Sequence, residues 1–314
     1  MKPHEIKGLW LGLLGVAIFA LTLPMTRLAV GTPEAPQMSG MFIAMGRAVV
    51  AGVLSIGFLL ATRAPWPRRA DWRPLALTAA GVVFGFPLFT SIAMRYVEAI
   101  HASVIVGVLP LATALVGALL HRQRPSTGFW VCGVLGSLLV MAFAVLKSAD
   151  GLRLHLADGL LLAAMACAAV GYGYGARLSQ RMRAEHVICW ALVLSLPLTL
   201  PLAATSLPAR PLSASAWWAF GYVAVFSMWI GFFAWYRGLA LGGTVRVSQV
   251  QLVQPFISML LAVPLLGERL DAVTAGFALA VIATVFIGKK MPVRATPATA
   301  RAPAPAPTLA PEKT

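Results

Sequence analysis

Charge is scarce in this sequence. Charged residues make up 11% of its 314 positions, whereas an average soluble domain carries about 25%. Hydrophobic residues account for 59%, which is more than a soluble protein of this length could keep away from water. The composition therefore excludes a soluble globular protein and indicates a chain whose main solvent is lipid.

Cysteine is also rare. Cys132, Cys167 and Cys189 are widely spaced, form no CxxC pair, and lie in or beside apolar segments. This excludes a disulfide framework and a cysteine-bound metal site, and we interpret the three as small buried hydrophobic residues. The sequence also lacks a phosphate-cradling GxxxxGK loop, so ATP is not expected to drive the protein directly. We predict no metal and no cofactor.

Acidic residues number only ten, and none lies in the middle of an apolar segment. Glu98 stands beside His101 at a short turn, where it is either a proton-coupling group or a solvated turn charge. His155 and Asp158 are three positions apart, which is too small a cluster to predict a membrane enzyme. The sequence therefore favours a protein without enzymatic activity and names no coupling ion.

Long apolar runs are what the sequence has in abundance. Each run approaches the about 20 residues that a helix needs to cross a bilayer. The runs are continuous and not alternating, which favours helices over a barrel. We therefore predict an all-α membrane protein with ten transmembrane helices, at about 8–30, 40–62, 74–95, 98–120, 127–147, 157–177, 187–206, 216–237, 244–266 and 271–288.

Basic residues are concentrated in alternate loops between these helices. With the N-terminus in the cytoplasm, Arg63, Arg68, Arg181 and Arg183 fall in cytoplasmic loops, as the positive-inside rule requires. We expect a multi-pass inner-membrane protein with both termini cytoplasmic. The net charge of +15 then reflects topology and does not indicate a nucleic-acid partner. The proline- and alanine-rich segment 291–314 is predicted to be a disordered cytoplasmic tail.

One apolar segment is written twice, 145 positions apart: 103–124 and 248–269. The two copies lie in the fourth and ninth predicted helices. Because these helices are five places apart in order, an odd number, they cross the membrane in opposite directions. We therefore predict two inverted five-helix repeats, residues 1–148 and 149–290, as in many secondary transporters. The aligned positions are Ser103 with Ser248, Pro110 with Pro255, and Arg124 with Arg269.

The repeated segment resembles the EamA-like family of the drug/metabolite transporter superfamily. The second copy has the family pattern of Ser248, Pro255, the run LLGER at 265–269 and Gly276, whereas the first copy ends in the basic run 122–124. The resemblance covers about residues 8–288 and implies a ten-helix basket with a central cavity, working by alternating access. It also implies export of small organic metabolites, such as amino acids or drug-like compounds.

The repeated prolines are candidate hinges. Pro110 and Pro255 stand inside predicted helices, where a proline removes one backbone hydrogen bond and bends the helix. Lipid does not tolerate the freed backbone groups unless protein or cavity water satisfies them. Each proline is thus either a flexing point beside a cavity or a static kink that shapes packing.

Polar residues on the ninth predicted helix are candidate substrate ligands. In an α-helix, Ser248, Gln251 and Pro255 share one face, whereas Gln249 and Gln254 lie off it. An unpaired buried glutamine costs a few kcal/mol, so this face should border a cavity or another helix. We assign Ser248 and Gln251 to the substrate site, together with Ser103, the counterpart of Ser248.

The remaining candidates are one arginine and three aromatic residues. Arg47 lies mid-segment, and the family often has an arginine there; it is either an anchor for a substrate carboxylate or a structural contact, because a central arginine is costly in a membrane. Trp229 and Tyr236 share a face of the eighth predicted helix, and Tyr172 lies on the sixth. Aromatic side chains suit a substrate wall or the membrane interface.

These features predict a secondary transporter whose partners are a small-molecule substrate and the lipid bilayer. We expect a monomer or a homodimer. A flippase for lipids or lipid-linked molecules, or a non-transporting membrane enzyme, are the alternatives that the sequence leaves open.

Overall fold

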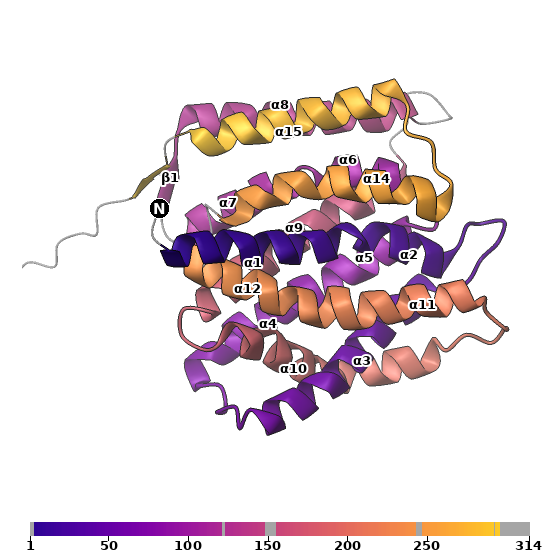
Figure 1. Ribbon diagram of the computed structural model, residues 1–314, viewed down its shortest axis with the longest axis vertical. Helices are drawn as coiled ribbons and strands as arrows, with labels where there is room; N and C mark the ends of the chain where they lie inside the picture. The colour runs from indigo at the N-terminus through magenta and orange to yellow at the C-terminus, as the bar shows by residue number, and fades with distance from the viewer. Residues whose placement is uncertain (1–2, 121–122, 148–154, 243–246, 292, 296–314) are drawn as a thin grey trace, which may run out of the picture.

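The computed structural model describes residues 3–120, 123–147, 155–242, 247–291 and 293–295. Within these ranges the protein is a bundle of helices that run roughly along one common direction (Figure 1). Two short strands are the exception. The all-helical membrane fold expected from the apolar runs is thus confirmed for the described part of the chain.

The first half of the chain forms eight α-helices and two other helical turns. They are α1 (Pro3–Ala20), α2 (Thr22–Val30), α3 (Gly40–Ala61), the 3₁₀ turn η1 (Arg69–Asp71), α4 (Trp72–Ala79), the π-helix η2 (Ala80–Gly85), α5 (Phe86–Ala93), α6 (Ala99–Val106), α7 (Leu109–Leu120) and α8 (Thr127–Lys147).

The second half repeats this order. It contains α9 (Leu156–Leu178), α10 (Ala184–Thr205), α11 (Ala214–Tyr222), the π-helix η3 (Val223–Ile230), α12 (Gly231–Gly242), the 3₁₀-helix η4 (Ser248–Val253), α14 (Gln254–Leu266) and α15 (Ala272–Lys290). The strands are β1 (Gln123–Pro125) and β2 (Val293–Ala295), which pair antiparallel.

Seven described segments are long and apolar enough to cross a membrane, at 3–30, 40–61, 69–93, 99–120, 156–178, 184–205 and 214–242. They coincide with seven of the ten predicted helices. At the other three predicted positions the structure has α8, η4 with α14, and α15. Two of these contain the shorter apolar helices Val250–Leu266 and Ala272–Thr284.

Several of the long segments change helix type midway. The helices α5, α7 and α14 each begin one residue before a proline, namely Pro87, Pro110 and Pro255. A proline has no N–H for the preceding turn and clashes with the carbonyl four residues back. The regular helix therefore restarts there, after η2, after the turn at 107–108 and after η4. Proline alone does not force this, because α10 runs unbroken through Pro197 and Pro201.

The elements of the two halves match at nearly constant spacing. The helices α5 and α12 begin 145 residues apart, as do α7 and α14, and α8 and α15. The π-helices η2 and η3 end 145 residues apart, at Gly85 and Ile230. The offset found by aligning residues 103–124 with 248–269 therefore also relates the irregular parts of the backbone, which the aligned letters do not encode.

Many contacts between elements also recur when the two halves of the chain are exchanged. Matching elements pack on one another, as α3 does on α10 and α8 on α15, and the contact of α6 with α14 has its counterpart in that of η4 with α7. The contact of α1 with α12 has its counterpart in the contact of α9 with η2 and α5. Figure 1 shows α8 and α15 together at one edge of the bundle, beside the body formed by the other helices.

Glycines permit the tightest of these contacts. A Cβ on Gly238 of α12 would lie 2.7 Å from the backbone nitrogen of Gly12, and one on Gly8 would lie 2.6 Å from that of Gly242. In the counterpart pair, a Cβ on Gly81 of η2 would lie 2.7 Å from the nitrogen of Gly171. Small residues let helix backbones approach closely, which is a main source of helix association in membranes.

Loop contacts divide the helix ends into two groups. At one end, Arg181 forms an ion pair of 3.7 Å with Asp71, so the segments around 63–73 and 177–183 lie on one face, as predicted. At the other end, the backbone N–H of Ser213 donates to Gln37 Oε1 at 3.0 Å. Strand β1 lies at the same end of the bundle as the N-terminus (Figure 1).

The predicted tail, 291–314, is described only at its beginning. Arg294 of β2 stands opposite Arg124 of β1 in the ladder. Residues 292 and 296–314 lie outside the described part of the chain, so the structure does not test the prediction of disorder for them.

Candidate functional site

A small polar cavity lies among the central helices. Its volume is about 10 Å³, enough for about one water molecule. Its lining combines aromatic rings with hydroxyl, amide and guanidinium groups, and no Asp or Glu is among the described residues that line it. The lining residues are Phe19, Thr22, Arg47, Val82, Phe86, Tyr172, Ser227, Phe232 and Gln254.

Arg47 of α3 is the charged centre of this site. Its side chain is 1% exposed, and Nη2 donates a hydrogen bond of 3.4 Å to Ser227 Oγ. Ser227 and Thr22 hydroxyls are hydrogen-bonded at 2.8 Å. Among the described residues, Arg47 Nε and Nη1 have no hydrogen-bond partner. A buried cation in this position is costly until an anion or acceptor meets it.

The irregular parts of the backbone converge on this cavity. Thr22 begins α2 after the break in the first span, Val82 lies in η2, Ser227 lies in η3, and Gln254 begins α14 after η4. Irregular backbone at membrane depth survives where protein or a water-filled cavity surrounds it, and π-helical turns occur often at functional sites. These breaks in the helices thus lie around Arg47.

The predicted aromatic residues occupy different places. Tyr172 lines the cavity, and its ring packs against Phe232 at a centroid distance of 6.1 Å. Tyr236 is fully buried but donates its hydroxyl to the carbonyl of Gly171 at 3.2 Å. Trp229 packs on Phe58 and Phe233 and is not among the cavity-lining residues.

Of the two glutamines Gln251 and Gln254, the second lines the cavity, whereas the sequence favoured the first. Gln251 is 1% exposed, and neither its amide nitrogen nor its oxygen has a partner among the described residues. It does not line the cavity, whereas Gln254 does. The sequence analysis treated 248–255 as α-helix, but 248–253 is a 3₁₀-helix. With three residues per turn, positions 251 and 254 fall on one face.

The two predicted serines also differ in position. Ser103 is buried and donates to the carbonyl of Ala99 at 2.6 Å, with Ser258 Oγ at 2.9 Å. It thus joins α6 to α14 and is not among the residues that line the cavity. The side chain of Ser248 lies outside what the structure describes.

The turn before Pro110 lies close to Pro255. The chain turns at Gly107, between α6 and α7, and a Cβ on Gly107 would lie 3.7 Å from Pro255 Cγ. Pro110 is buried at the start of α7. The broken points of two matching helices therefore meet, although a static structure does not test whether they flex.

Three charged residues escaped the sequence analysis because their partners are far away along the chain. Arg27 donates to the carbonyls of Met94 and Arg95, both at 2.6 Å. Arg95 donates to the carbonyl of Met38 at 2.6 Å. Each guanidinium thus satisfies carbonyls near the ends of other helices.

Glu268 is the third of these residues. Its carboxylate accepts hydrogen bonds from the backbone N–H groups of Ala99 and Ile100, at 2.7 and 2.8 Å. It thereby caps α6, a helix of the other half, where a negative charge meets the positive end of the helix dipole. Burial is the largest influence on Glu268 and raises its pKa, while the two amide donors oppose that shift.

Comparison with known proteins agrees with this arrangement. The model of the EamA-like transporter family matches the chain twice, at residues 6–146 and 155–288. The chain is 43% identical over 287 residues to "Uncharacterized transporter YdeK" of Bacillus subtilis (strain 168), covering 89% of this chain and 96% of that one. These matches indicate a transporter and not an enzyme.

A solved crystal structure has the same fold. It superposes with a TM-score of 0.60 at 20% sequence identity, covering 89% of this chain and 95% of the other. Each half of the chain matches the family model separately, which agrees with the duplicated element order. The chain therefore belongs to the EamA-like transporter family.

Proposed function

We propose that this protein is a secondary transporter that exports small organic metabolites bearing a carboxylate. In this proposal, ten transmembrane helices form two inverted five-helix repeats in the inner membrane, with both termini in the cytoplasm. The substrate binds in the central cavity at Arg47, and the two halves rock about Pro110 and Pro255 to expose that cavity to each side in turn.

The buried, unneutralised guanidinium of Arg47 is the observation that carries the proposal. Nε and Nη1 are unpaired donors of a buried cation, and a carboxylate accepts strong charge-assisted hydrogen bonds from such groups. Ser227, Thr22 and Gln254 add neutral polar groups, while Phe19 and Phe232 add apolar surface. A carboxylate on an organic body of modest size fits this mixture of groups.

The small volume of the central cavity indicates that the conformation described here does not hold a substrate. At about 10 Å³ the site is too small for any organic substrate, because small-molecule sites measure about 300–1,000 Å³. Binding therefore requires the central helices to separate. The breaks beside Pro110 and Pro255 supply positions at which such a movement would leave the regular helices intact.

The repeat symmetry supports the inverted topology. Matching helices pack on one another, and the two π-helical segments end 145 residues apart. The pairing of β1 with β2 requires an even number of crossings between residues 125 and 293, and the proposed topology has six. The basic loop residues at the end that carries Arg181 agree with a cytoplasmic face.

A flux experiment tests the proposal. The purified protein is reconstituted in liposomes and screened with labelled amino acids, nucleobases and cationic drugs, in the wild type and in Arg47→Met. We expect flux of carboxylate-bearing solutes that falls at least tenfold in Arg47→Met. Flux restricted to cations, or undiminished by the substitution, would contradict the assignment of Arg47; lipid movement without solute flux would support a flippase instead.

A further inference from the structure

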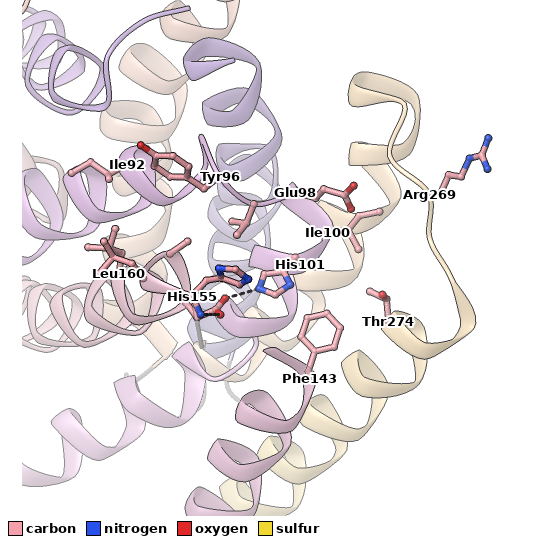
Figure 2. A pocket seen from close by; sticks show the side chains of 14 residues that line it. Ile92, Tyr96, Glu98, Ile100, His101, Phe143, His155, Leu160, Arg269 and Thr274 are labelled. Carbon is pink, nitrogen blue, oxygen red and sulfur yellow. Dashed lines mark hydrogen bonds and ion pairs between the residues drawn. The ribbon is translucent and has the colours of Figure 1, made fainter. Parts of the chain in front are cut away.

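A second, larger cavity is separate from the Arg47 site. Its volume is about 750 Å³, and it shares no lining residue with the central cavity. It lies among the N-terminal ends of α6, α9 and α15 and the loops before them (Figure 2). In the proposed topology this is the outer face of the membrane.

A histidine–carboxylate contact joins the two halves at the lining of this cavity. His101 Nε2 of α6 lies 2.7 Å from Asp158 Oδ1 of α9. The His101 side chain is 15% exposed and the Asp158 side chain 3%, so the imidazole faces the cavity while the carboxylate is buried behind it. In Figure 2 a dashed line marks this contact at the labelled His101.

The second carboxylate oxygen of Asp158 is also engaged. Asp158 Oδ2 accepts a hydrogen bond from the backbone N–H of His155 at 3.2 Å, which places the acid in the first turn of α9. A negative charge is favoured at the N-terminus of a helix. Asp158 is therefore held in position with one oxygen directed at His101.

Other charged groups surround the pair. Glu98 and Arg269 line the pocket, as does His155. Glu268 holds the first amides of α6, two residues before His101. The described lining residues from α8 and α15 are Phe143 and Thr274, which carry no charge. Asp158 is thus the acid bonded directly to the imidazole.

Histidine is the side chain whose charge ordinarily changes between pH 5 and 8. A protonated His101 makes a charge-assisted bond to Asp158, about twice as strong as a neutral one. Loss of the proton leaves a neutral imidazole opposite a buried carboxylate. The contact between α6 and α9 is therefore stronger when the proton is bound.

We propose that His101 and Asp158 form a proton-binding site that joins the outer ends of the two halves and makes transport depend on external pH. The proton comes from water in the pocket and resides on the imidazole, paired with the carboxylate. Bound proton favours the conformation described here; its loss releases α6 from α9. The effect of pH on transport rests on the proposed transport function, whereas the proton-binding site does not.

Hydrogen exchange of the full-length protein in nanodiscs tests the site without any substrate. Protection factors, corrected for the intrinsic rate at each pH, are compared for the starts of α6 and α9 between pH 5.5 and 8.5. We expect wild-type protection to fall about tenfold as pH rises, because the neutral imidazole makes the weaker bond to the carboxylate. His101→Gln and Asp158→Asn should both abolish this pH dependence.

His186→Gln provides the control, because His186 lies at the opposite end of the bundle and contacts Thr62 at 3.4 Å. It should retain the wild-type pH dependence at α6. The proposal is overturned if protection in the wild type is independent of pH, or if His101→Gln and Asp158→Asn leave the dependence intact. Both substitutions keep the side-chain size, and thermal unfolding checks that each variant folds.

Liposome flux at varied external pH then tests the consequence. With a solute from the screen, wild-type flux should change with external pH and His101→Gln flux should not. Equal pH dependence in both would refute the regulatory role while leaving the transport function standing. Absence of all solute flux, together with pH-dependent exchange, would refute the transport function and support the proton site.

Discussion

Arg47 carries a buried charge that the described part of the chain does not neutralise, and this single residue has the sharpest energetic consequence. Replacing buried ionic groups by apolar side chains of similar volume is often neutral or stabilising, by about 1–4 kcal/mol. Arg47 should therefore lower the stability of the folded protein while it provides a binding group for the substrate. Arg95, a second arginine of the bundle, should instead stabilise the folded protein, because its guanidinium donates a hydrogen bond to the carbonyl of Met38 at 2.6 Å.

Thermal unfolding in detergent separates these roles. We expect Arg47→Met to keep or raise the unfolding temperature and Arg95→Met to lower it by several degrees, since an orphaned buried carbonyl costs about 1–3 kcal/mol. A fall in Arg47→Met as large as that in Arg95→Met would mean that Arg47 is a structural contact.

Glu268 gives a prediction with a defined sign. Burial raises its pKa above the ordinary 4.5, so the native state binds the proton more tightly than the unfolded state. Its ionisation therefore costs stability as pH rises through the native pKa. The unfolding temperature of Glu268→Gln minus that of the wild type should increase between about pH 4 and pH 7.

The matched control is Glu34→Gln, whose expected trend has the opposite sign. Hydrogen bonds from its own backbone and from Thr32 lower the pKa of Glu34. Its ionised form thus stabilises the native state, and the benefit is lost as pH falls. The difference for Glu34→Gln should decrease as pH rises. Parallel trends for the two variants would show that the amide donors outweigh burial at Glu268, which would contradict the raised pKa.

At the scale of elements, the contact of α1 with α12 depends on glycine. A Cβ on Gly238 would lie 2.7 Å from a backbone nitrogen of α1, and backbone cannot move aside as a side chain does. We expect Gly238→Ala to force the helices apart at a cost of about 1–3 kcal/mol and to lower the unfolding temperature. Gly57→Ala on α3, where a Cβ would meet nothing within 4 Å, should be neutral or stabilising.

The start of α14 gives a kinetic prediction. Pro255→Ala restores a backbone donor at the junction of η4 and α14, which favours one continuous helix. We expect turnover to fall more than substrate affinity in a flux assay. Pro197→Ala in the unbroken helix α10 should change neither. Weaker binding at unchanged turnover in Pro255→Ala would argue against a hinge.

The sequence predicted these elements unevenly, for physical reasons. The apolar runs located the helices well, because membrane thickness fixes their length. The helix types were not predictable, since π and 3₁₀ turns depend on packing against other helices. The helix type changes which glutamine faces the cavity: Gln254 lines it, and the assignment of Gln251 to the substrate site stays a prediction. The bonds of Arg27 and Glu268 were missed because their partners are 67 and 169 residues away.

At the scale of the whole molecule, the matching contacts imply two similar bodies around one cavity. The Arg47 site has ligands from both: Thr22 and Arg47 from the first half, and Tyr172, Ser227 and Gln254 from the second. A relative movement of the halves would therefore divide the site, and its side chains would become exposed to whichever face opens.

Site-directed labelling of Ser227→Cys tests this central claim most directly. The variant is made in a protein whose Cys132, Cys167 and Cys189 are replaced, and a membrane-impermeant thiol reagent is applied to right-side-out and to inside-out vesicles. We predict labelling from both faces, slowed by a transported solute in each orientation. Labelling from one face alone, or from neither, would contradict a cavity that opens alternately to the two sides.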